Sequence, residues 1–172
     1  MRPGDAVIGA SASYSHPSVV RAASHVGARF IDTAGRAMCK AAISDEPRVA
    51  LVDLTRLAVT YDLMPVEEIR DIVRMAHEKG ALVYMDDAGG ARVGPTGFGQ
   101  PRMLELGVDI GATGLDKYGT VGPRLGLLAG RADLVGRIRA AGFEFGLEAR
   151  GRCSTRRWCT PLSNTTPRES EP

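Results

Sequence analysis

Short apolar runs rich in valine alternate along the chain with segments of helical periodicity, and this alternation limits the fold more than any other feature of the sequence. Two of the runs, 48–54 (RVALVDL) and 81–86 (ALVYMD), are almost continuously apolar, as expected of strands that are covered on both faces. Strands that are separated by helices usually pair in parallel. We therefore predict an α/β fold with a doubly wound, mostly parallel sheet.

The residue pattern also predicts the individual elements. The clearest helix is predicted between Pro65 and Gly80, because apolar residues fall on one face there and charged residues on the other. Pro65 suits its beginning and Gly80 its end. The stretch between residues 87 and 101 is rich in Gly and Pro and is predicted to form a loop. The predicted strands are 6–10, 28–32, 48–54, 81–86, 108–114 and 124–130, and further helices are predicted after Pro17 and over 36–43, 101–107 and 132–141.

Composition limits the class of protein. The 172 residues have room for one ordinary domain, and 22 basic against 20 acidic side chains give a net charge of +2, which disfavours a dedicated nucleic-acid binder. Three cysteines are too few and too irregularly spaced for a disulfide framework or a paired zinc site. We expect an incomplete large domain over residues 1–150, a disordered Ser/Arg/Pro-rich tail over 151–172, and a cytoplasmic location, since no secretory signal or membrane span is found.

Two carboxylates follow the fourth predicted strand, where ligands of parallel sheets usually bind. Asp86 and Asp87 precede a glycine pair and can simply cap a turn. Alternatively, one of them holds a cation, either a metal ion or a protonated ring nitrogen. The three histidines show no ligand spacing with these acids, which weakens the metal alternative.

Two further segments carry side chains that are able to do chemistry. Lys117 lies in a predicted turn between two buried strands, next to glycines and a proline. A lone lysine is usually a solvated surface charge, but desolvation in such a turn would lower its pKa and make it a nucleophile for Schiff-base formation. His16 lies in a strand-to-helix loop, where it is either an ordinary loop histidine or part of a site.

Together these segments resemble the large domain of fold type I pyridoxal-phosphate enzymes. The resemblance consists of an acid that ends a strand, an alanine two residues later, and a lysine in a Gly-rich turn before an antiparallel strand. The segment LDKYGTVGPRLGLLAGRADLVGRI resembles bacterial selenocysteine synthase, the L-seryl-tRNA(Sec) selenium transferase. SHPSVVRAA, YMDDAGGARV, QPRMLELGVD and GFEFGLEAR are similar to the archaeal selenocysteine-synthase-like proteins, and the resemblance covers residues 3 to 150.

The resemblance implies a role for several residues. Lys117 matches the lysine that forms the Schiff base with pyridoxal 5′-phosphate, and Asp86 matches the acid that pairs with the pyridinium nitrogen. Ala88 matches the small residue against one face of the cofactor ring, and His16 lies in the region that covers the other face.

The remaining implied contacts depart from the family pattern. Thr113 is the implied phosphate ligand, but Gly114 stands where the superfamily often has a hydroxyl residue. Arg124 is implied to meet a substrate carboxylate or another subunit. The N-terminal arm, the Gly/Ser-rich phosphate loop and the small C-terminal domain of the family have no counterpart here, so we expect a chain that is truncated at both ends, with the tail as a frameshift product.

Three functions remain open at this stage. The first is a pyridoxal-phosphate transferase that eliminates at Cβ of an amino acid or aminoacyl-tRNA and adds a selenium or sulfur nucleophile. The second is a lyase or desulfurase that acts on a free amino acid, for which Cys39, on a predicted helix, is a poor persulfide carrier. The third is a catalytically inactive fragment. The family also implies a homo-oligomer, a dimer or higher, without membrane contact.

Overall fold

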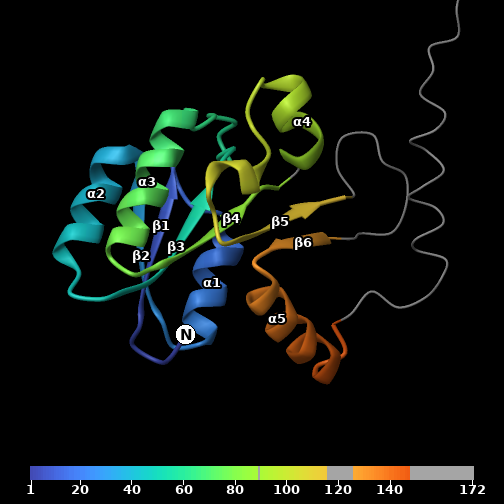
Figure 1. The fold of residues 1–172 in the computed structure, drawn as a ribbon. Helices are drawn as coiled ribbons and strands as arrows, with labels where there is room; N and C mark the ends of the chain where they lie inside the picture. The colour runs from blue at the N-terminus through green and yellow to red at the C-terminus, as the bar shows by residue number, and fades with distance from the viewer. Residues whose placement is uncertain (89, 116–125, 148–172) are drawn as a thin grey trace, which may run out of the picture.

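The computed structural model of the chain describes residues 1–88, 90–115 and 126–147. Its described strands form one six-stranded sheet in the order β2-β1-β3-β4-β5-β6 (Figure 1). All neighbours pair in parallel except β5 and β6, which are antiparallel. The strands are β1 (Ala6–Ser11), β2 (Arg29–Ala34), β3 (Val49–Thr55), β4 (Leu82–Asp86), β5 (Ile110–Gly114) and β6 (Gly126–Gly130). The predicted α/β class with a mostly parallel sheet is thus confirmed.

Helices lie against both faces of the sheet (Figure 1). One face is covered by α2 (Gly35–Asp45), α3 (Val66–Glu78) and a short 3₁₀ helix, η1 (Met103–Leu106). The other face carries α1 (Pro17–His25) beside β2 and α5 (Ala132–Glu144) beside β6. No described helix is long and apolar enough to cross a membrane.

The main hydrophobic core lies between the sheet and the pair α2 and α3. Helix α3 buries one face there, and alternate residues of β3 and β4 face it from the sheet. This agrees with the helical periodicity of the sequence and with the predicted end of the helix, because Gly80 takes a left-handed backbone (φ 75°) that favours glycine. The main contributors are Val52, Leu54, Ile69, Ile72, Val73, Ala76, Val83 and Met85.

The opposite face is only partly covered. Among the residues of α1 only Ala23 is buried, and no residue of α5 is buried. The small cluster on this face consists of Val7, Ala23 and Ala28, with Phe30 and Leu51 half-buried against it. The helices therefore shield this face of the sheet less completely than the other.

One element differs from the sequence prediction. The structure places a short helix, α4 (Gly90–Gly97), where a Gly- and Pro-rich loop was predicted, and Pro95 lies inside it. Tertiary contacts explain the difference, because Gly94 packs so closely on the buried guanidinium of Arg56 that a side chain there would clash. The proposed boundary between an ordered domain and a tail at residue 150 falls outside the described residues.

Candidate functional site

A hollow of about 290 Å³ lies at the carboxyl ends of β4 and β5, beside the beginning of α1. It brings together His16, Asp86, Ala88 and Thr113, which the sequence placed in one site although they come from three separate segments. Parallel strands all present their carboxyl ends at the same edge, which explains why these segments meet. Its other lining residues are Ser18, Ala112, Gly114 and Gly126, and we call this space the strand-end hollow. Lys117 and Arg124 lie outside the described residues.

The two adjacent carboxylates separate at this edge. Asp86 is half-buried and lines the strand-end hollow. Asp87 is 3% exposed, and its carboxylate forms an ion pair with the Nε of Arg56 at 3.1 Å. Successive side chains of a strand point to opposite faces, so only one of two neighbouring acids can serve the hollow. Asp86 is therefore the candidate ligand, and Asp87 is a structural residue.

Arg56 is the buried partner that sequence reasoning missed. It follows β3 directly, is 1% exposed, and donates a hydrogen bond from Nη1 to the carbonyl oxygen of Pro101 at 2.8 Å. Burial lowers the pKa of Arg56 and raises the pKa of Asp87, while each charge favours the charged form of the other. The sequence signal was a lone arginine in the uncharged stretch LTRLAV, directly after a buried strand.

The residues around Asp86 are small, which suits a flat ligand. Ala88, Ala112, Gly114 and Gly126 leave the strand-end hollow free of bulky side chains. A carboxylate beside such a space can accept a hydrogen bond from a protonated ring nitrogen. The arrangement fits an aromatic cofactor whose ring nitrogen faces Asp86.

His16 lies at the rim of the hollow and caps α1. Its Nδ1 accepts a hydrogen bond from the backbone N–H of Ser18 at 3.2 Å, and the Ser18 hydroxyl lies 2.6 Å from the same nitrogen. An acceptor Nδ1 assigns the proton of the neutral ring to Nε2. The cap thus fixes the exposed imidazole at the entrance, with its Nε2 available to donate.

Thr113 is bound into the sheet edge. The side chain is 2% exposed, and its hydroxyl donates to the carbonyl oxygen of Asp87 at 2.9 Å. The same proton cannot be donated to a phosphate in this arrangement. The role of Thr113 as a phosphate ligand stays a prediction, and in this structure its hydroxyl proton is already donated to Asp87.

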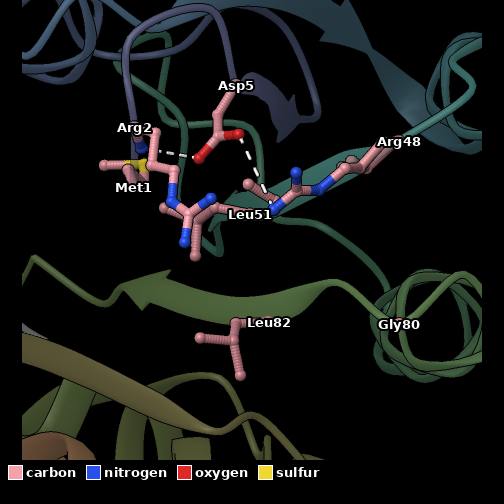
Figure 2. Close-up of a pocket in the computed structure, with 9 residues that line it drawn as sticks. Met1, Arg2, Asp5, Arg48, Leu51, Gly80 and Leu82 are labelled. Carbon is pink, nitrogen blue, oxygen red and sulfur yellow. Dashed lines mark hydrogen bonds and ion pairs between the residues drawn. The ribbon is translucent and has the colours of Figure 1, made fainter.

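A second cavity, of about 330 Å³, lies at the opposite edge of the sheet (Figure 2). Here Asp5 accepts a hydrogen bond from the backbone N–H of Arg2 at 2.6 Å and lies 3.9 Å from the guanidinium of Arg48. Leu82 and Val49, which also line it, begin β4 and β3. This is the amino-terminal edge of these strands, where ligands of parallel sheets do not usually bind.

Cys39 is completely buried in α2 on the far side of the sheet. Burial raises the pKa of its thiol to about 11. Thiolate is the reactive form of cysteine, so this residue is a poor nucleophile. Cys39 therefore does not suit the role of a persulfide carrier.

No profile of a known protein family matches the chain. Among solved structures, the fold is similar to that of an apo methionine gamma lyase from Micromonospora echinospora, with a TM-score of 0.75, 25% identity, and coverage of 92% of this chain and 42% of that one. A cystathionine gamma-lyase from Lactobacillus plantarum in complex with L-serine has a TM-score of 0.60 at 20% identity, with coverage of 80% and 35%. The described sheet thus has the fold of the type I pyridoxal-phosphate enzymes.

Curated relatives refine this class. The chain is 35% identical over 135 residues to a UPF0425 pyridoxal phosphate-dependent protein of Methanosphaera stadtmanae, which covers 78% of this chain and 34% of the relative. A protein of the same description from Methanothermobacter thermautotrophicus is 34% identical over 137 residues, with the same coverage. The chain is thus similar to part of the UPF0425 pyridoxal phosphate-dependent proteins, and it spans about a third of their length.

Proposed function

We propose that this chain forms the cofactor-binding part of a pyridoxal-phosphate-dependent protein that acts on an amino acid. The observation that carries the proposal is the convergence of His16, Asp86 and Ala88 on one hollow at the carboxyl ends of the strands. The names of the UPF0425 relatives support the same cofactor.

Bound pyridoxal phosphate supplies an electron sink for negative charge that develops on a substrate carbon. Asp86 holds a proton at the ring nitrogen, because its carboxylate favours the positively charged pyridinium. Ala88 and the neighbouring glycines would pack on the ring, and His16 would close the opposite side. Lys117 would hold the cofactor through its amine and would move a proton at the substrate Cα.

For the reaction we favour elimination from a free amino acid. The similarity to a methionine gamma lyase over 92% of the chain supports this class. Transfer of selenium to seryl-tRNA is the second candidate and rests on the segment that begins at Leu115. It is less favoured, because a chain with a net charge of +2 offers little attraction for a polyanion. In both cases, we propose that a second subunit or further chain completes the phosphate site.

Substitution of Asp86 tests cofactor binding. We expect Asp86→Asn to weaken pyridoxal phosphate at least about tenfold in an absorbance titration, because a charge-assisted hydrogen bond is lost. Asp62→Asn is the matched control, since Asp62 is exposed and outside the hollow. Asp86→Asn with the affinity of the unsubstituted chain would refute the role of Asp86.

The reaction class needs a separate assay. Release of a 2-oxo acid from a free thiol amino acid by the cofactor-loaded protein would support the lyase. Cofactor binding without turnover of any amino acid would leave a binding protein and refute catalysis by this chain alone.

A further inference from the structure

A larger cavity, of about 590 Å³, lies on the less covered face of the sheet, beneath α1. Apolar side chains form most of its wall, including Val7 and Leu51 from the sheet and Val19, Ala22 and Val26 from α1. We call this space the α1 groove. It adjoins the strand-end hollow, because Ser18 and Asp86 line both.

Asp53 lies in the wall of the α1 groove and is only 2% exposed. Neither of its carboxylate oxygens has a hydrogen-bond partner among the described residues. In the sheet, Asp53 is in register with Gly9 of β1 and Tyr84 of β4. Gly9 has no side chain that could bond to the carboxylate, and Asp53 is among the residues that line the groove.

The charged side chains around the groove are acidic, and Met1, which also lines it, carries the cationic N-terminal amine. Asp86 lines it as well, and Asp32 of β2 is in register with Gly9 in the same row of the sheet. None of the side chains that line the groove is cationic. Asp5 already binds the N–H of Arg2 and faces Arg48 at the other edge of the sheet (Figure 2), so these arginines do not serve Asp53.

A buried carboxylate without a partner is costly in its ionised form, and it must either keep a proton or meet a cation. Burial and the charges of Asp86 and Asp32 raise the pKa of Asp53 to about 7. A metal ion is a poor match, because no three His, Cys, Asp or Glu side chains in the described part of the chain are placed to hold one. An ammonium group with an apolar body matches both the acid and the wall.

We infer that the α1 groove binds a protonated organic amine, whose ammonium donates hydrogen bonds to Asp53 and whose apolar part packs on Val7, Leu51 and α1. Amine binding at Asp53 and cofactor binding at Asp86 are separate predictions, so either can fail without the other.

Calorimetric titration of the cofactor-free protein with phenethylamine tests this inference, at about pH 8, where both the amine and the Asp53 carboxylate are charged. The matched ligand is phenylethanol, which has a similar shape but no charge. We expect phenethylamine to bind at least about tenfold more tightly than phenylethanol.

Two substitutions and one control locate the site. Asp53→Asn keeps the shape of the side chain and is expected to remove the preference for the amine. Ala22→Phe fills the groove from an exposed helix position and is expected to weaken both ligands, so the test does not depend on one variant. Asp62→Asn, outside the groove, should bind like the unsubstituted chain.

Three results would overturn the inference. The first is equal affinity for the amine and the alcohol. The second is unchanged amine binding in Asp53→Asn, and the third is no amine binding at all. Amine binding that is lost in Asp86→Asn but kept in Asp53→Asn would assign the amine to the strand-end hollow and would also overturn it.

Discussion

Asp86 and Asp87 are neighbours in the sequence, but they have different surroundings and different roles. Both acids end the same buried strand, and the sequence alone left open whether they cap a turn or hold a cation. The resemblance to known enzymes pointed to Asp86, and the structure places Asp86 in the strand-end hollow and Asp87 against Arg56. The alternation of side chains along a strand predicts that the two acids point to opposite faces of the sheet. It does not predict which face carries the site, because that depends on how the helices pack.

Asp53 was missed because it lies within an apolar run that predicts only a buried strand. The structure shows that β3 buries it on the face without the main core. An acid inside a valine-rich strand is the signal that could have been used, since an unpaired buried carboxylate is unusual.

The raised pKa of Asp53 predicts a pH dependence of stability. The group keeps its proton in the folded chain up to about pH 7, but an unfolded chain releases it near an ordinary pKa of 3.8. The contribution of Asp53 to the free energy of unfolding is therefore largest below pH 3.8, the pKa in the unfolded chain. It falls as the pH rises from there to about 7, and it stays constant above that pH. The groups that face it are Asp32 of β2 and Tyr84 and Asp86 of β4, and α1 adds no titratable side chain to the groove.

Urea unfolding at several pH values between 3.8 and about 7 tests this prediction. The measured quantity is the difference in the free energy of unfolding between the original chain and Asp53→Asn. We expect the advantage of Asp53→Asn to grow by roughly 4 kcal/mol across the window, at about 1.4 kcal/mol for each pKa unit. A difference that stays constant with pH would contradict the assigned protonation of Asp53.

At the scale of elements, hydrophobic periodicity predicted the strands and α3 with small boundary differences. It predicted a loop where α4 forms, because the local composition is unfavourable for a helix. Arg56 explains the exception, since its guanidinium packs on Gly94 of α4 and bonds to Pro101 beyond it. Such a contact links segments that are far apart in sequence, so no local pattern could predict it.

Removal of Arg56 should therefore destabilise the fold strongly. Arg56→Met leaves the buried Asp87 without its counter-charge, and we expect a loss of about 3–5 kcal/mol in the free energy of unfolding. Arg74→Ala, which removes an exposed ion pair with Glu78 on α3, should change it little. Denaturant unfolding of both variants measures this, and equal effects would contradict the bracing role of Arg56.

At the scale of the whole molecule, the sheet is unevenly covered. Helix α5 has no buried residue, and the apolar side chains of Ile138, Phe143, Phe145 and Leu147 are exposed next to β6. Exposed apolar surface of this kind favours association. The homo-oligomer that the family resemblance implied remains a prediction, and this surface is where we place it.

Light scattering after size-exclusion chromatography measures the oligomeric state. We expect the chain to form dimers or larger species and Phe145→Asp to shift them toward the monomer. Tyr61→Asp is the matched control, because Tyr61 is also an exposed aromatic residue but belongs to the loop after β3 and not to α5. A monomeric original chain, or equal effects of the two substitutions, would contradict this surface as the interface.

The site could be predicted from the sequence only in part. Four predicted residues meet in one hollow, whereas Lys117 and Arg124 lie outside the described residues. Their roles rest on the family resemblance, so the amine that holds the cofactor is the point most in need of a measurement.

The most direct measurement is the absorption spectrum of the purified chain with pyridoxal phosphate, followed by borohydride reduction and peptide mapping. We predict a Schiff-base band at about 410–430 nm, with the reduced cofactor on Lys117. The band should be absent in Lys117→Ala and present in Lys79→Ala, which removes an exposed lysine at the end of α3. No band, or label spread over surface lysines, would contradict a functional cofactor site in this chain.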